Sequence, residues 1–302
     1  MKGHNSDLYI LAFDHRGTLT KGLLGVEGRE PSVEEEKKVQ EMKSIIFDGF
    51  KTALDKGESK ENCAILVDER FGLAVQKEAK ELGIRFAAPV EKSGQKIFDF
   101  EYGENFGEKI HEIGADFIKI LVRWNPDDDR ESREVQGERI KKLSEWIEEN
   151  EKKFLLEFLI PPTEEQLQKV EGNQQRYDSE VRPGLAVKVV EEMRERGADP
   201  DIWKIEGLEK KEDCEKVSFA IRDKDREGVI AVVLGRGADN EKVNEWLSAG
   251  SCVEGYKGFA IGRSIFWESL KNWVSEDISR EEAVDKISES YRNFISVYKG
   301  AS

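Results

Sequence analysis

The sequence of 302 residues is poor in the side chains that form disulfides and zinc sites. It has three cysteines and three histidines, and no CxxC pair or Cys/His cluster joins Cys63, Cys214 and Cys252. We therefore expect no metal site, and we predict no other cofactor. An odd number of scattered cysteines is typical of a reducing compartment, which predicts a cytoplasmic protein.

Long apolar runs are also missing. No stretch approaches the roughly 20 residues that a membrane helix needs. The apolar run near the amino terminus is interrupted by Asp14 and does not fit a signal peptide. The net charge of −15 predicts a surface that repels nucleic acids and anionic membranes. Neither is expected as a partner, whereas a small anionic substrate needs only a local basic pocket.

What the sequence does contain is a regular alternation of short apolar runs with long, charged, amphipathic segments. Each run has about the length of a buried parallel strand. The eight runs are Leu8–Phe13, Cys63–Val67, Arg85–Val90, Phe117–Val122, Phe154–Ile160, Ile202–Ile205, Val229–Leu234 and Gly258–Ile261. Eight strand–helix units predict an α/β fold, a closed (β/α)8 TIM barrel that forms a single domain over residues 1–302.

The competing fold is an open, doubly wound sheet. A nucleotide-binding fold of that kind has a glycine-rich turn after its first strand, but here that turn reads AFDHRGTLT, with neither GxGxxG nor a Walker lysine motif. The barrel is therefore the favoured fold.

The segments between the runs carry signals for helix ends. Capping-box spacing occurs at Ser32 with Glu35, Thr163 with Gln166 and Ser279 with Glu282. Pro183 is suited to open a helix, and Gly83, Gly114 and Gly197 fall where helices should stop. The segments Lys21–Pro31 and Glu171–Arg182 are expected to be long loops on the barrel face.

Three charged residues are flanked on both sides by apolar strand residues. Lys119 lies within FIKILV, Glu157 within LLEFLI and Lys204 within IWKIEG. Lysine and glutamate are almost never fully buried unless they are paired. A structural ion pair would explain one such residue, but three on consecutive strands favour a functional site, and barrel enzymes place their chemistry at the carboxyl ends of the strands.

These residue types suit an amine nucleophile. The pKa of a free lysine is about 10.4. Burial and a nearby cation both lower that pKa. We therefore expect Lys204 to be activated by burial and by Lys119 on a neighbouring strand. Glu157 is suited to carry protons while an imine forms. Breaking a carbon–carbon bond also needs a base for a hydroxyl proton, for which Asp14 and Glu157 are both candidates.

A phosphate site is predicted after the last two strands. Gly235 and Gly262 would let backbone N–H groups approach an anion there, and Arg263 or Arg236 would add a bidentate contact. The alternative is that these glycines are merely turn residues.

Other strand ends offer further candidates for substrate contact. They are His15 and Arg16 after the first strand and Arg123 at the end of the fourth. His15 has a second interpretation, as a loop residue packed against Asp14. The carboxylates Asp68, Glu91 and Glu206 remain open between lining the pocket and pairing with other charges.

The strand ends AFDHR, FIKILVRW, LLEFLIPP and IWKIEG resemble the class I aldolase family that includes tagatose-1,6-bisphosphate aldolase. The chain from about Leu8 to Trp273 looks most similar to the 5-dehydro-2-deoxyphosphogluconate aldolase domain of inositol catabolism, and EKSGQKIFDFEYG, RWNPDDD and VVLGRGADNEKVNEWL add to that likeness. The resemblance implies a metal-independent lyase that releases dihydroxyacetone phosphate from a phosphorylated keto sugar or keto sugar acid.

The resemblance also implies roles for individual residues. The family's Schiff-base lysine falls on Lys204, its other catalytic residues on Lys119, Glu157 and Asp14, and its phosphate-binding glycine and arginine on Gly262 and Arg263. The chain departs from the family at His15, where glutamine is usual.

Two alternatives to an aldolase remain. Asp68, Glu91, Glu157 and Glu206 would hold Mg²⁺ in a metal-dependent barrel enzyme acting on a sugar phosphate. A non-catalytic barrel that binds a sugar phosphate is the other. For assembly, Phe266, Trp267 and Trp273 would either pack on the barrel or form a homo-oligomer interface.

Overall fold

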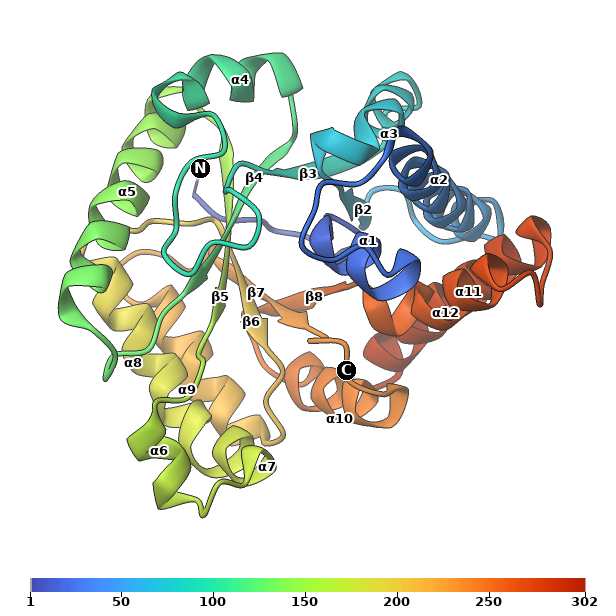
Figure 1. The fold of residues 1–302 in the computed structure, drawn as a ribbon. Coiled ribbons are helices and arrows are strands. Elements are labelled where there is room, and N and C mark those ends of the chain that lie inside the picture. Colours follow the sequence, from blue (N-terminus) through green and yellow to red (C-terminus); the bar gives the residue numbers. More distant parts are fainter. Residues whose placement is uncertain (1, 302) are drawn as a thin grey trace.

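Eight parallel strands pair in chain order, and the first also pairs with the last, so the sheet closes into a barrel (Figure 1). The computed structural model describes residues 2–301, so residues 1 and 302 of the predicted domain lie outside the described residues. The strands are β1 (Leu8–Ala12), β2 (Cys63–Leu66), β3 (Arg85–Pro89), β4 (Phe117–Arg123), β5 (Lys153–Leu159), β6 (Ile202–Glu206), β7 (Ile230–Leu234) and β8 (Tyr256–Ile261). Every predicted run overlaps one of these strands, and the closed barrel is confirmed.

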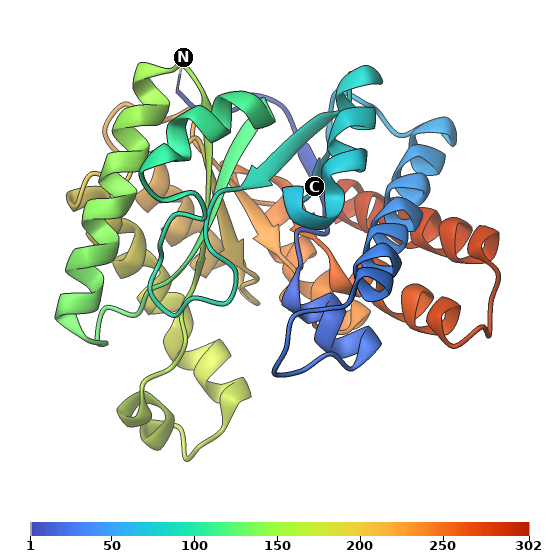
Figure 2. The same ribbon diagram turned by 45° about the horizontal axis from the view of Figure 1, so that its top comes forward.

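Helices surround the barrel (Figures 1 and 2). They are α1 (Gly17–Leu24), α2 (Val33–Asp55), α3 (Glu69–Glu81), α4 (Phe106–Ile113), α5 (Arg130–Glu149), α6 (Glu164–Lys169), α7 (Gln174–Arg176), α8 (Arg182–Glu195), α9 (Lys211–Arg222), α10 (Asn240–Ser251), α11 (Arg263–Val274) and α12 (Arg280–Ala301), with a 3-10 turn η1 (Gly103–Asn105) and a π-helix η2 (Tyr177–Val181). None of them, within residues 2–301, has the length and apolar character that crossing a membrane requires.

The predicted helix ends are confirmed. All three capping boxes form, and in each the first residue's hydroxyl accepts the N–H three residues on while that residue's side chain accepts in return. Pro183 lies in the first turn of α8, and Gly114 closes α4 in the left-handed conformation that glycine adopts without cost.

The two predicted loops are partly helical, which corrects that expectation. Lys21 and the three residues after it belong to α1. This helix begins without a side-chain cap, so the sequence carries no capping signal for it. Most of Glu171–Arg182 forms α7 and η2, because the Asn173 side chain accepts the N–H groups of the following turn and Arg176 pairs with Glu180. In Figure 2 the segment with α6 and α7 projects from the barrel.

Side chains inside the barrel form an apolar layer separate from the larger core between strands and helices. The inner layer consists of Leu8, Ile10, Ala12, Ala64, Leu66, Ala87, Phe117, Leu155, Ile202, Ile230, Val232 and Ala260. Because side chains alternate across a strand, the residues two positions after Ala12, Phe117, Leu155 and Ile202 point inward as well. Those residues are Asp14, Lys119, Glu157 and Lys204.

The last helix, α12, packs on the barrel and makes a hydrogen bond to the first strand, β1. The α12 helix packs against α2 and α11 on one side of the barrel (Figure 1), and the hydroxyl of its buried Tyr291 donates to the Tyr9 carbonyl of β1 at 2.6 Å. The three aromatic residues considered for an interface also contact other residues of this chain. Phe266 is buried, Trp267 lies against Gly22 of α1, and Trp273 lies under the Lys38 ammonium.

Candidate active site

A cavity of about 1090 Å³ opens at the carboxyl ends of the strands. Its lining includes every residue predicted from the sequence: Asp14, His15, Arg16, Lys119, Arg123, Glu157, Lys204, Gly235, Arg236, Gly262 and Arg263. Ten lysines and arginines line it against six aspartates and glutamates, although the whole chain has a net charge of −15. The cavity is thus a local basic pocket on an acidic protein.

Three carboxylates surround the Lys119 ammonium near the floor of the cavity. Its Nζ lies 2.8 Å from Asp14 Oδ2, 2.8 Å from Glu91 Oε1 and 3.1 Å from Glu157 Oε2. The side chain is only 1% exposed, so the charge is kept inside by these partners rather than by water.

Lys204 contacts the same Glu157 oxygen. The two residues face each other across the β5–β6 ladder, and Nζ of Lys204 lies 3.0 Å from Oε2 of Glu157. The expectation that Lys119 lies on a strand next to Lys204 was wrong, because β5 separates β4 from β6. A carboxylate between two ammonium groups therefore replaces the direct contact of two cations.

Burial and charge act against each other in this cluster. Burial favours neutral carboxyl groups, but Lys119 and Lys204 outweigh it and lower the pKa of both Asp14 and Glu157. Burial would lower the pKa of Lys119, yet Asp14, Glu157 and Glu91 raise it well above its ordinary value. Burial wins at Glu91 and raises its pKa, and the second oxygen of Glu91 has no hydrogen-bond partner among the described residues. These three carboxylates thus favour the charged form of Lys119.

A second buried ion pair supports the same strand end. Lys43 of α2 is fully buried, and its Nζ donates to the carbonyls of Phe13 and His15 at 2.5 and 3.1 Å and pairs with Asp68. The carbonyls lie on either side of Asp14. Sequence reasoning did not single out Lys43, although a lysine on the apolar stripe of a helix was a usable signal.

His15 lies beside the cluster with its ring edge against Phe266, at 5.8 Å between ring centres. Burial, against the opposing charge of Asp14, lowers the pKa of His15 to about 4. Its Nδ1 is buried and has no hydrogen-bond partner among the described residues. A neutral imidazole with a free nitrogen is suited to a substrate hydroxyl.

Two arginines are held at the cavity rim by the loop that follows β3. Arg16 donates to the Glu91 carbonyl at 2.8 Å and pairs with Glu101, and Arg123 donates to the Gln95 carbonyl at 2.8 Å. Each keeps further N–H groups for other acceptors.

The ends of β7 and β8 come together around Arg263. Its Nη2 donates to the Arg236 carbonyl at 2.6 Å, and its guanidinium packs on Gly237, where a Cβ would lie 2.5 Å from Cζ. Burial lowers the pKa of Arg263, and no carboxylate among the described residues opposes this shift. The α11 helix begins here at Arg263, after Gly262, with no side-chain cap. An unneutralised guanidinium beside a helix amino terminus favours an anion.

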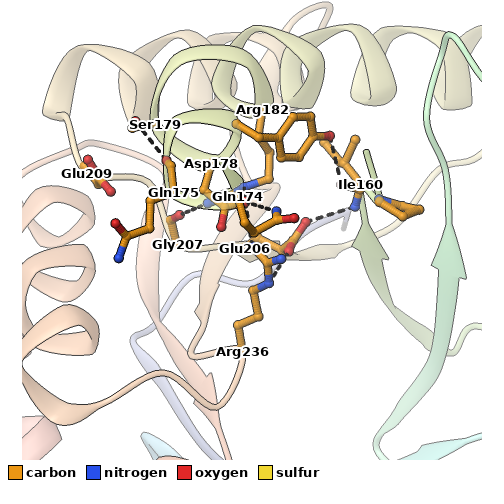
Figure 3. Close-up of polar contacts among 12 residues, drawn as sticks. Ile160, Gln174, Gln175, Asp178, Ser179, Arg182, Glu206, Gly207, Glu209 and Arg236 are labelled. Atoms are coloured by element: carbon orange, nitrogen blue, oxygen red, sulfur yellow. Dashed lines mark hydrogen bonds and ion pairs between the residues drawn. The ribbon is translucent and has the colours of Figure 1, made fainter. Parts of the chain in front are cut away.

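Arg236 differs from Arg263 because carboxylates hold it (Figure 3). Its Nη1 lies 2.7 Å from Asp178 Oδ1 and its Nε 3.1 Å from Glu206 Oε1. Of the two arginines proposed for phosphate, Arg263 is the one without a carboxylate partner among the described residues.

Each of the four carboxylates considered for Mg²⁺ pairs with a lysine or arginine of the chain. Asp68 binds Lys43, Glu206 binds Arg236, and Glu91 and Glu157 bind Lys119. In the part of the chain that the structure describes, no three histidine, cysteine, aspartate or glutamate side chains are placed to hold a metal ion.

The fold and the cavity define a (β/α)8 barrel with a lysine–carboxylate cluster at the carboxyl ends of its strands. The chain belongs to the family DUF2090, described as "Uncharacterized protein conserved in bacteria", whose sequence pattern matches residues 1–302.

Among curated proteins, the chain is similar to tagatose 1,6-diphosphate aldolase 2 of Streptococcus pyogenes serotype M1. The two are 25% identical over 155 residues, which are 49% of this chain and 43% of the aldolase, and the enzymes of serotypes M18 and M6 give the same values. The match thus spans less than half the length of those relatives. Among solved structures, Cgl0159 from Corynebacterium glutamicum shares the fold, with a TM-score of 0.55, 17% identity and coverage of 95% of this chain and 86% of that one.

Proposed function

We propose that the protein is a class I aldolase whose Lys204 forms a Schiff base with a phosphorylated keto sugar or keto sugar acid. The observation that carries the proposal is the contact of buried Lys204 with Glu157 in a basic cavity. The similarity to part of the streptococcal aldolases supports the reaction class.

Imine formation uses the Lys204–Glu157 contact. The amine must first lose its proton, and Glu157 is at hydrogen-bond distance to take it. The amine then adds to the keto carbon, the carbonyl oxygen gains a proton, and loss of water leaves a protonated imine.

Cleavage then needs a base on the far side of the cluster. Asp14, kept ionised by Lys119, takes the substrate hydroxyl proton, and the carbon–carbon bond breaks. The hydroxyl-bearing fragment leaves as an aldehyde, and the electron pair of the broken bond moves to the imine to give an enamine. Glu157 stays the second candidate for this base. Protonation of the enamine carbon and hydrolysis release the keto product, for which we propose dihydroxyacetone phosphate, and restore the amine.

The anion site completes the proposal. The substrate phosphate binds at Gly262 and Arg263, with the backbone at Gly235 adding N–H groups. The rim residues Arg16 and Arg123 contact the rest of a substrate like 5-dehydro-2-deoxyphosphogluconate.

Borohydride reduction with dihydroxyacetone phosphate tests the proposal. One covalent adduct is expected, and peptide mapping should place it on Lys204 and find none in Lys204→Met. An unmodified wild-type protein whose activity requires an added metal ion would overturn the proposal.

A further inference from the structure

We propose that Asp178 is a positioning residue for the anion site: through Arg236 it fixes the main-chain carbonyl that holds Arg263. The inference rests on the proposed function, because it assumes that Arg263 binds the substrate phosphate. Asp178 belongs to the π-helix η2 in the segment that projects from the barrel.

The connection runs through one residue with an unusual backbone. The backbone of Arg236 has a φ of +53°, a value that residues other than glycine rarely adopt. Its guanidinium is tied to Asp178 and Glu206, while its carbonyl accepts from Arg263 Nη2 at 2.6 Å. Anchoring the side chain thus restrains the peptide that carries this carbonyl.

Glu206 anchors Arg236 from the barrel side. It is 3% exposed, and its other oxygen, Oε2, accepts the N–H of Ile160 at 2.9 Å (Figure 3). It stands two residues after Lys204 on β6, so the same strand carries the proposed nucleophile and one anchor of Arg236.

Asp178 anchors Arg236 from the projecting segment, and η2 itself is firmly held. The Tyr177 hydroxyl is buried and donates to the Ile160 carbonyl at 3.0 Å, and buried Arg182 donates to Asp178 at 3.1 Å and to the Gly207 carbonyl at 2.9 Å. π-Helical turns occur frequently at functional sites. Here the turn directs Asp178 toward Arg236, whereas Glu180 of the same turn is exposed and pairs with Arg176.

The test measures binding of inorganic phosphate and of dihydroxyacetone phosphate by titration calorimetry. We expect Arg263→Gln to abolish detectable binding and Asp178→Asn to weaken it about tenfold, with Glu180→Gln, the matched control in η2, unchanged. At saturating dihydroxyacetone phosphate, Asp178→Asn should reach the wild-type extent of borohydride adduct, because Lys204 is untouched. Arg236→Gln removes the same link from the other end and should weaken binding similarly, which keeps the test decisive should Asp178→Asn fold poorly.

The possible failures are distinct. Wild-type affinity in Arg263→Gln would overturn the anion site itself. Loss in Arg263→Gln with wild-type affinity in both Asp178→Asn and Arg236→Gln would overturn only the positioning role. Tighter phosphate binding in Asp178→Asn would show that Arg236 is itself a phosphate ligand restrained by Asp178. An equal loss of phosphate affinity in Glu180→Gln would show that the effect is a general disturbance of the turn. Either result overturns the inference.

Discussion

Glu157 and Lys204 are direct partners across the β5–β6 ladder, and Glu157 Oε2, 3.0 Å from Lys204 Nζ, is also the oxygen that contacts Lys119. In the proposed mechanism, one carboxylate oxygen thus faces both the Lys204 amine, which must lose its proton, and the Lys119 ammonium, which keeps its own. This arrangement separates the roles of two buried lysines.

Glu157→Gln should therefore leave the barrel folded but slow the reaction. We expect kcat to fall by about 10²–10⁴-fold, because the amide can neither take the Lys204 proton nor return it. Rapid-quench borohydride trapping should show the adduct forming more slowly. Trapping at the wild-type rate would contradict the shuttle role.

Lys119→Met should be costly for stability as well as activity. The change leaves Asp14 and Glu91 without their ion-pair partner and Glu157 with Lys204 alone, which should cost about 3–5 kcal/mol of unfolding free energy. Denaturant unfolding measures the loss. Lys119→Arg keeps the charge and should lose less; equal losses would mean that size, not charge, matters.

Lys43→Met tests the buried ion pair behind Asp14. The change leaves Asp68 buried without a cation and removes the hydrogen bonds to the carbonyls on both sides of Asp14. We therefore expect the free energy of unfolding, measured in urea, to fall by about 3–5 kcal/mol. Lys51→Met on the same helix is the matched control, since its ion pairs are partly exposed and should be worth less than about 1 kcal/mol. Similar losses in the two variants would contradict the assignment.

Acid should destabilise the fold through two histidines. Burial lowers the pKa of both His4 and His15 to about 4, against about 6.5 in the unfolded chain. Between these values the unfolded chain binds protons that the folded chain does not, so stability is lost as pH falls from about 6.5 to 4. His4→Gln with His15→Gln should flatten the unfolding free energy across this window, and an unchanged slope would refute the explanation.

Gly262→Ala tests how closely β8 approaches β1. A Cβ there would lie 2.1 Å from the Ala12 carbonyl oxygen and 3.0 Å from His15 Cε1. We expect a loss of about 1–3 kcal/mol together with weaker phosphate binding. Gly184→Ala in α8, where nothing lies within 4 Å, is the control and should be neutral or slightly stabilising. Equal effects would show that the contact with β1 is unimportant.

The strands and the cluster were predictable because their information is local. Apolar runs marked the strands, and Lys119, Glu157 and Lys204 stood out because apolar strand residues flank each of them. The link from Lys43 to Asp68 was not predictable, because it depends on how α2 packs beside β2. Asp178 was missed because its π-helical turn was interpreted as a loop, although the Asn173 cap was readable.

The pairing of β1 with β8 also determines when the barrel can close during translation. The strand that precedes Asp14 leaves the ribosome before the other seven strands of the barrel, and its last partner follows about 245 residues later, roughly 10–50 s at ordinary translation speeds. Until then the nascent sheet carries an unpaired edge, the kind of surface that recruits other chains. Tyr291, which donates to Tyr9, arrives later still. Chaperone demand during translation should therefore last until the final helix is complete.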